Sequence, residues 1–351
     1  MFLVIFGAGA SYDSVPSRPP SRYARPSLFT RPPLADELFL ADNFFADCLS
    51  LYPRAKPIVP YLQQPQEQGA SLEHVLEELQ AEGDSDPERK RQVAAIRFYL
   101  HHVLWQCERR WNGTARGTTN YLTLLDQLRR SREARSNDKP ILLVTFNYDT
   151  LIEQSLASFN MPLNEVDDYI RGDFFKLFKV HGSINWVREI DSTILNVQEK
   201  NHSDLVHEFI DKVPYLQVSD RFRCVTRSLD DPVGKIDSKP VFPAIAIPVE
   251  TKVSFECPSD HLDALSRHLP EVTHVLTIGW RGNEAHFLKL LEAGFNGRSV
   301  LFQTVASGKP DAEAVLARIK GAGINASGEA TPYGGFTDYV VRREAEKFFR
   351  S

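Results

Sequence analysis

Short apolar runs alternate with helical patterns along much of the chain. The runs lie at residues 2–6, 141–146, 174–182, 273–280 and 299–305. Continuous apolar runs of this length are typical of strands that are buried on both faces of a parallel sheet. We therefore predict an α/β fold, a Rossmann-like parallel sheet flanked by helices. In such a fold the ligand site lies beyond the carboxyl ends of the strands.

Three segments interrupt this alternation. Between residues 34 and 128 the apolar residues recur three or four positions apart, which predicts a helical insertion. Residues 187–240 are polar and weakly periodic, and we interpret them as a second insertion. Residues 15–33 hold six prolines and four arginines, which predicts a loop. The chain, residues 1–351, is thus predicted to form a single domain that carries two insertions.

The composition is that of a folded, water-soluble protein, with 42% hydrophobic and 25% charged residues. A formal net charge of -5 gives no general attraction for nucleic acid or anionic lipid. No stretch reaches the roughly 18 apolar residues that span a bilayer, so we expect no membrane partner. The four cysteines form no CxxC pair, which predicts a reduced, cytoplasmic compartment, no zinc ribbon and no metal.

The first apolar run ends in GAGAS, residues 7–11. Gly7 and Gly9 would let the backbone turn tightly and approach a pyrophosphate at the start of a helix. The third glycine of the dinucleotide pattern G-x-G-x-x-G is absent, because Tyr12 stands three positions after Gly9. An ordinary nicotinamide dehydrogenase is therefore a poor fit, and a plain tight turn is the alternative for this motif alone.

Polar residues also end the next two runs. In TFNYD, Asn147 and Asp149 stand two apart, so an extended strand would aim both side chains to one side. Asn147 could bind ribose hydroxyls, and Asp149 could stabilise an oxocarbenium-like centre; an Asx-type turn or helix cap is an equal alternative for Asp149. In KVHGS, His181 could act as a general base, although a lone histidine is more often a core residue.

In combination, these motifs resemble the NAD-binding motifs of the sirtuin superfamily. GAGAS resembles the opening GAG-x-S loop, TFNYD the T-x-N-x-D strand end, and KVHGS the catalytic histidine–glycine. THVLTIGW, residues 273–280, resembles the late strand whose glycine lines the same pocket. The resemblance implies that NAD is bound and is cut at its nicotinamide–ribose bond. It implies catalytic roles for His181, Asn147 and Asp149 and cofactor-binding roles for Gly7, Ala8, Gly9, Ser11, Thr145, Ser183 and Gly279.

The chain departs from the protein-deacylating members of that superfamily. Those members carry a zinc ribbon built from two cysteine pairs, whereas residues 187–240 contain only Cys224. Tyr148 replaces their usual isoleucine, and residues 16–33 take the place of their G-I-P-D-F-R loop. The pattern looks like the divergent bacterial sirtuin-like domains of anti-phage defence, which lack zinc and hydrolyse NAD to nicotinamide and ADP-ribose, often in large assemblies.

The resemblance thus implies an NAD glycohydrolase that depletes cellular NAD during abortive infection. The alternatives are a non-catalytic sensor of NAD or ADP-ribose, an NAD-dependent protein deacylase, and a fortuitous set of motifs. Because a freely active enzyme would drain the NAD of its own cell, we expect a homo-oligomer gated by a partner protein or a phage-derived trigger. The sequence leaves open whether Arg18, Arg22, Arg25 and Arg31 contact NAD, a partner or solvent.

Overall fold

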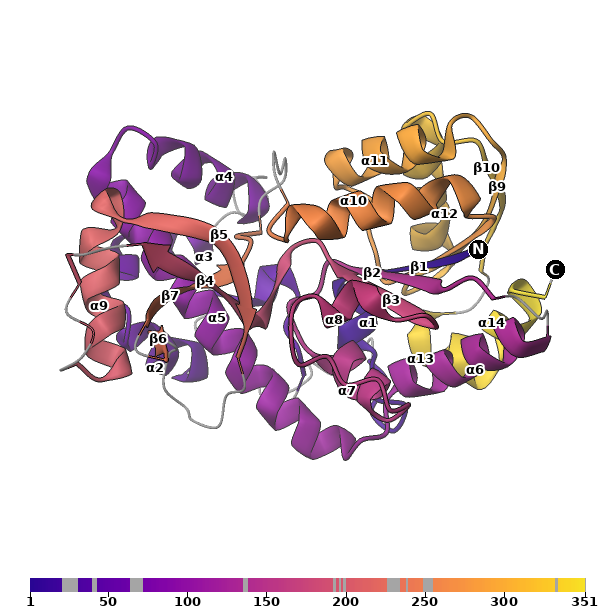
Figure 1. Ribbon diagram of the computed structural model, residues 1–351, viewed down its shortest axis with the longest axis horizontal. Coiled ribbons are helices and arrows are strands. Elements are labelled where there is room, and N and C mark those ends of the chain that lie inside the picture. The colour runs from indigo at the N-terminus through magenta and orange to yellow at the C-terminus, as the bar shows by residue number, and fades with distance from the viewer. Residues whose placement is uncertain are drawn as a thin grey trace.

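The chain folds into two lobes, and one long helix, α5 (Pro87–Ala115), runs from one into the other (Figure 1). The computed structural model describes residues 1–20, 31–39, 43–63, 72–134, 138–191, 194–195, 197, 200–225, 234–237, 239–248, 255–331 and 334–350. In this part of the chain, no helix combines the length and apolar character needed to cross a membrane.

A six-stranded parallel sheet forms the centre of the first lobe. Its strands are β1 (Phe2–Phe6), β2 (Ile141–Thr145), β3 (Phe175–Lys179), β8 (His274–Ile278), β9 (Val300–Val305) and β10 (Ala326–Ala330). Their spatial order is β10-β9-β8-β1-β2-β3. Counted along the chain this order is 3-2-1-4-5-6, which is that of dinucleotide-binding folds. The predicted Rossmann-like α/β sheet is therefore confirmed.

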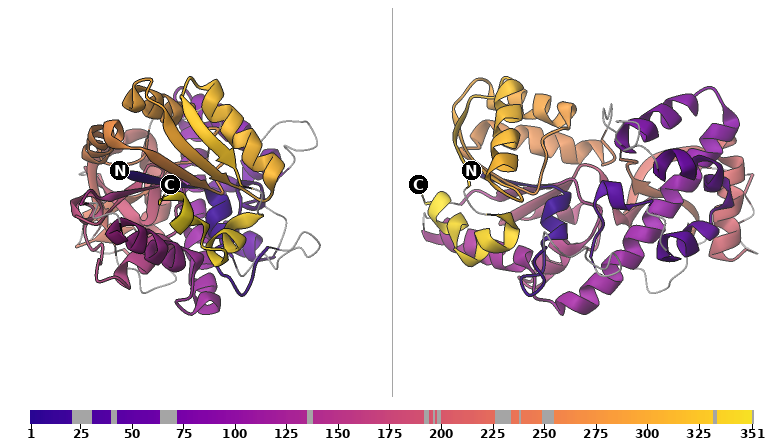
Figure 2. Two further views of the ribbon diagram at one scale, coloured as in Figure 1. Left: turned by 90° about the vertical axis from the view of Figure 1, so that its right-hand side faces the viewer. Right: turned by 180° about the vertical axis from the view of Figure 1, so that it is seen from behind.

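Helices cover both faces of this sheet (Figures 1 and 2). Phe2, Val4 and Phe6 of β1 pack in one core, and Leu3 and Ile5 pack in the opposite core. The first core includes side chains of α6 (Asn120–Ala134), α7 (Leu151–Ala157), α8 (Asp168–Arg171), α13 (Gly335–Val341) and α14 (Glu344–Phe348); the second includes side chains of α10 (Ser259–His268), α11 (Ala285–Phe295) and α12 (Lys309–Gly321). Burial on both faces explains why the strands are continuous apolar runs.

The second lobe contains an antiparallel sheet that the sequence pattern does not predict. Its strands lie in the order β5 (Gln217–Cys224), β4 (Gly182–Asp191), β7 (Lys239–Ile245) and β6 (Lys235–Ile236). The helical elements around it are α2 (Asn43–Ser50), η3 (Pro53–Ile58), α3 (Val59–Gln63), α4 (Leu72–Glu82), α5 and α9 (His202–Lys212). The sheet begins before residue 187 and ends after residue 240, so the second insertion is continuous with the strand-end motif KVHGS.

One hydrophobic core unites the two segments that the sequence suggests as separate insertions. It contains side chains from residues 38–107 and from residues 184–247. Helix α6, which begins within the range 34–128, packs instead in the core of the parallel-sheet lobe. Neither segment of the second lobe therefore buries its apolar side chains without the other.

Helix α5 extends through both lobes because strong signals define its two ends. Asp86 caps its first turn by accepting from the Glu88 amide, and Pro87 occupies the first helical position. At the other end, Arg116 adopts a left-handed conformation. The middle of the helix packs in the second lobe, whereas Trp111 and Ala115 near its end pack against the parallel sheet. The helix thus links the two cores covalently.

Short elements complete the fold. They are helix α1 (Ala8–Tyr12) and the 3₁₀ turns η2 (Ala35–Glu37), η5 (Val213–Tyr215) and η6 (Leu269–Glu271). Helix α1 starts directly after β1, so the motif GAGAS forms a turn and a short helix rather than a longer loop. This arrangement brings the motif to the carboxyl edge of the central strand.

Candidate functional site

A cavity of about 970 Å³ lies at the carboxyl edge of the parallel sheet, between the two lobes. The strand order reverses at β1 and β8, and this is the position at which open α/β sheets bind ligands. The volume is at the upper end of the range of small-molecule sites. Its walls are formed by residues that follow β1, β2, β3, β8 and β9, and by Leu38 and Leu104 from the second lobe.

Three glycines allow the loop after β1 to pack against the loop after β8. A Cβ atom on Gly7 would lie 2.5 Å from the Gly279 carbonyl oxygen. Gly279 itself has φ +60, and a Cβ atom there would collide with the backbone of Gly9 and Ala10. The glycines of GAGAS therefore have a packing role at this edge, whatever ligand the cavity binds.

We expect Gly279→Ala to lower the free energy of unfolding by about 2–5 kcal/mol, because backbone strain and overpacking act together. Gly282→Ala is the matched control. Gly282 also has a positive φ, +73, but its added Cβ atom would meet no heavy atom closer than 3.8 Å. We expect a loss of only about 1–2 kcal/mol there, from strain alone. Urea unfolding measures both, and equal losses would contradict the packing role.

Several backbone amides of the loop after β1 already donate hydrogen bonds to backbone carbonyls. The Gly7 amide donates to the Ile278 carbonyl at 3.0 Å, and the Gly9 amide donates to the Gly279 carbonyl at 3.1 Å. The Ala10 amide donates to the Gly7 carbonyl at 2.9 Å. A phosphate at this loop would not find these three donors available.

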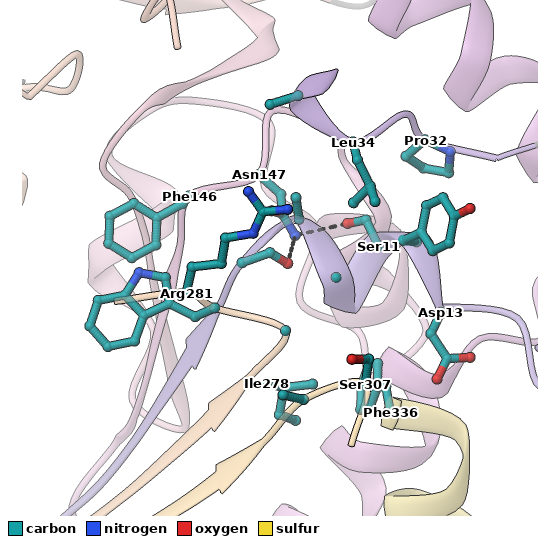
Figure 3. A pocket seen from close by; sticks show the side chains of 18 of the residues that line it. Ser11, Asp13, Pro32, Leu34, Phe146, Asn147, Ile278, Arg281, Ser307 and Phe336 are labelled. Carbon is teal, nitrogen blue, oxygen red and sulfur yellow. Dashed lines mark hydrogen bonds between the residues drawn. The ribbon is translucent and has the colours of Figure 1, made fainter. Parts of the chain in front are cut away.

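Asn147 is held in place by its amide nitrogen (Figure 3). Nδ2 carries two hydrogens and has three acceptors within reach: the Gly7 carbonyl at 2.9 Å, the Ser11 hydroxyl at 2.9 Å and the Tyr121 hydroxyl at 3.2 Å. Because a carbonyl only accepts, the Gly7 contact fixes which end of the amide is nitrogen. Asn147 lines the cavity. Its Oδ1 atom is thus the end that accepts from a ligand hydroxyl or a water.

Asp149 lies buried at the floor of the same cavity. The Ser11 hydroxyl donates to Oδ2 at 2.5 Å, and the Leu151 amide donates to Oδ1 at 3.2 Å. The bond from Leu151 forms an Asx-type turn at the start of α7. Asp149 therefore has this local structural role and also lies on the cavity wall. Burial raises the pKa of Asp149, and the nearby Lys179 ammonium acts in the opposite direction.

Lys179 is a buried cation directly behind these residues. Its Nζ atom donates to the Asp149 carbonyl and, at 2.8 Å, to Oε1 of Glu153. Burial raises the pKa of Glu153, and Lys179 partly offsets this effect. The Tyr169 hydroxyl also donates to Oε1 of Glu153, at 3.2 Å. One lysine therefore balances two buried carboxylates beneath the cavity.

Glu108 connects helix α5 to the loop that carries Asn147 and Asp149. Its Oε2 atom accepts from the Thr150 amide at 2.5 Å, and Oε1 accepts from the Thr150 hydroxyl at 2.7 Å and from Gln154 at 3.1 Å. Burial, and next the charge of Asp149, raises the pKa of Glu108 to about 7. A carboxylate from α5 thus caps the first turn of α7.

His181 lines the cavity at the junction between the parallel and antiparallel sheets. Its ring lies edge-on to Phe146 with the ring centroids 4.8 Å apart, and the Tyr148 ring centroid is 6.4 Å away. The next residue, Gly182, has φ +79 and begins β4. Any side chain there would collide with the Ala244 carbonyl, so glycine is required for the chain to enter the second sheet beside His181.

Two predicted pocket residues, Thr145 and Ser183, are not among the residues that line the cavity. The Thr145 hydroxyl accepts from the Asn147 amide at 3.0 Å. The Ser183 hydroxyl donates to Oδ1 of Asn185 at 2.5 Å, and it lies 3.3 Å from the Tyr148 carbonyl oxygen. Both therefore shape the loops behind the wall. The other predicted residues, Gly7, Ala8, Gly9, Ser11, Asn147, Asp149, His181 and Gly279, line the cavity together.

The arginine-rich segment is described only in part, since Arg22 and Arg25 lie outside the described residues. Arg31 is buried, and its guanidinium donates to the carbonyls of Tyr12 at 3.0 Å and Arg18 at 3.2 Å. The guanidinium also lies over the Tyr12 ring, 4.7 Å from its centroid. Arg31 thus anchors its own segment to α1.

No protein-family model matches the chain, and no curated protein matches it at a significant level. Within the described ranges, no group of three or more histidine, cysteine, aspartate or glutamate residues is arranged to hold a metal ion. The chemistry of the site must therefore be argued from its own side chains. Sequence reasoning missed Glu108, Tyr121, Lys179 and Arg281; the one available signal was Lys179, one of two lysines in the run at residues 174–182.

Proposed function

We propose that this protein is an NAD glycohydrolase, which hydrolyses NAD to nicotinamide, ADP-ribose and a proton. One observation carries the proposal: His181, Asn147 and the glycine turn at residues 7–9 line one cavity at the switch point of the sheet. The likeness of GAGAS, TFNYD and KVHGS to the sirtuin superfamily supports NAD as the substrate. It also supports a cytoplasmic, oligomeric effector of anti-phage defence whose activity depends on a trigger.

In the proposed reaction, the bond between C1′ of the ribose and the nicotinamide nitrogen breaks. Nicotinamide leaves with the electron pair, and positive charge develops on the ribose. The Asp149 carboxylate at the cavity floor stabilises this charge, and Asn147 Oδ1 accepts from a ribose hydroxyl. A water then forms the new bond to C1′ and gives its proton to the His181 imidazole. No step needs a redox partner.

The aromatic side chains beside His181 suit this chemistry. Phe146 and Trp280 stack with their ring centroids 5.6 Å apart and an angle of 4° between the rings. The Trp280 indole donates to Glu284 at 2.6 Å, which fixes the orientation of its ring. Trp280 and Phe146 both line the cavity and offer an apolar wall for an aromatic leaving group such as nicotinamide. They also exclude bulk water from the reacting bond.

A non-catalytic sensor of NAD or ADP-ribose is the second candidate function. It is favoured by the state of Asp149, whose two carboxylate oxygens already accept hydrogen bonds from Ser11 and Leu151. A binding module needs only a shaped cavity, whereas the glycohydrolase needs the charge of Asp149 and a base. Tight NAD binding without cleavage would favour the sensor.

The decisive experiment incubates purified protein with NAD and follows nicotinamide and ADP-ribose by chromatography. We expect equimolar products, and we expect Asn147→Ala to lower the rate about 10²–10³-fold, as for loss of one polar group at a reacting centre. Asn164→Ala, on the exposed loop before α8, is the control.

Because a trigger is part of the proposal, the same variants are expressed in bacteria that are then challenged with phage. Cellular NAD should fall with the natural sequence and with Asn164→Ala, but not with Asn147→Ala. Cleavage that appears only with an acetylated peptide would indicate a deacylase. If NAD neither binds nor is cleaved in either setting, the motifs are fortuitous and the proposal fails.

A further inference from the structure

Arg281 presents a guanidinium group to the cavity. It lies in the turn after β8, its side chain is exposed, and it lines the cavity wall. Within the described part of the chain, no ion pair or hydrogen bond involves this guanidinium. Figure 3 shows the side chain extended toward Asn147, above the start of α1. A positive charge is thus held at the place where the loops after β1, β2 and β8 meet.

The backbone of this turn is fixed although the side chain of Arg281 is not. Gly279 and Gly282, on either side of it, both have positive φ angles, +60 and +73. The Arg318 guanidinium donates to the Arg281 carbonyl at 2.7 Å. The neighbouring Trp280 side chain is tied to Glu284. The turn is therefore preorganised, and only the arginine side chain has to adjust when an anion enters.

Several groups near Arg281 that could neutralise a bound anion already have other hydrogen-bond partners. The amides of Gly7, Gly9 and Ala10 in the loop after β1 donate to backbone carbonyls and are not available to a bound anion. Two other described arginines are already engaged: Arg31 donates to the carbonyls of Tyr12 and Arg18, and Arg318, on the cavity wall, donates to the Arg281 carbonyl. A diphosphate carries two negative charges, and a guanidinium binds phosphate oxygens in a two-pronged geometry that a lone amide cannot provide.

We propose that Arg281 binds the diphosphate of a dinucleotide in this cavity and thereby restricts its ligands to nucleotides with linked phosphates. The identity of the dinucleotide as NAD rests on the proposed function, whereas the phosphate-binding role of Arg281 does not. Arg281 recognises charge and geometry shared by NAD and ADP-ribose. Adenosine, which lacks phosphate, gains nothing from it.

The test compares Arg281→Gln and Arg281→Lys with Arg267→Gln, a substitution on the exposed side of α10 away from the cavity wall. Calorimetry measures the Kd of ADP-ribose and of adenosine for each protein. For ADP-ribose, we expect Arg281→Gln to raise Kd about 10–100-fold, the value of a hydrogen bond to a charged group. Arg281→Lys keeps the charge but loses the two-pronged geometry, so its Kd for ADP-ribose should lie between those of the natural sequence and Arg281→Gln. Adenosine binding should not change.

Two results would overturn the assignment: ADP-ribose binding by Arg281→Gln that equals that of Arg267→Gln, or an equal loss of adenosine binding, which would indicate a structural role. The proposed function is judged separately. If Arg281→Gln weakens ADP-ribose binding but the natural sequence never releases nicotinamide, this inference stands and the glycohydrolase fails. If the natural sequence binds neither NAD nor ADP-ribose, both fail.

Discussion

We expect His181→Ala to lower the rate of nicotinamide release about 10²–10⁴-fold at saturating NAD, the usual contribution of a general base. NAD binding is expected to persist, because the glycine turn, Asn147 and Arg281 are untouched. The effect therefore falls on kcat rather than on KM. Release of nicotinamide is measured by chromatography, and NAD affinity by calorimetry on the same preparations.

Two controls make the His181 result interpretable. His74 is a surface histidine on α4 with a side chain 48% exposed, and His74→Ala should retain the natural rate. His181→Asn keeps a polar side chain against the Phe146 ring, and it should be as inactive as His181→Ala. A natural rate in either His181 variant would show that the imidazole has no role in catalysis. Urea unfolding identifies any loss that comes from the fold.

Lys179→Met is expected to lower the free energy of unfolding by about 3–5 kcal/mol, because it leaves Glu153 and the Asp149 loop without their buried cation. The Lys179 side chain is 0% exposed and the Glu153 side chain 8%. The pKa of both carboxyl groups should rise further in this variant. Urea unfolding at neutral pH measures the loss.

A double-mutant cycle separates the charge effect from packing. Adding Glu153→Gln to Lys179→Met removes the orphaned charge, so the double variant should be more stable than the sum of the two single losses predicts. Lys139 pairs with Glu271 at the surface, with 53% of its side chain exposed, and Lys139→Met should cost about 0–1 kcal/mol. A Lys179→Met loss as small as this would refute the role of a buried counter-ion.

The parallel sheet follows from local sequence because burial on both faces produces continuous apolar runs. Strand β10 has no such run: Ser327, Gly328 and Glu329 are exposed at the edge of the sheet, where the strand pairs with β9. Strand β5 is similar, since most of its side chains are half-buried or exposed. These strands depend on neighbours that are distant in sequence, which a periodicity pattern does not contain.

The candidate site likewise contains residues that local sequence predicts and residues that it does not. Its strand-end residues follow from the strands themselves, because parallel strands bring their carboxyl ends to one edge. The partners of these residues come from elsewhere: Tyr121 from α6 bonds Asn147, and Glu108 from α5 caps the helix after Asp149. Nothing local in either helix marks these polar positions as buried. Their role arises only from tertiary packing.

The shared core of the second lobe has a consequence for the order in which the protein is made. Residues 38–107 cannot cover their apolar side chains until residues 184–247 have been synthesised. At about 5–20 residues per second, the roughly 140 residues between positions 107 and 247 take about 7–28 s on the ribosome. During that interval the nascent helices expose apolar surface. Slower translation lengthens this interval.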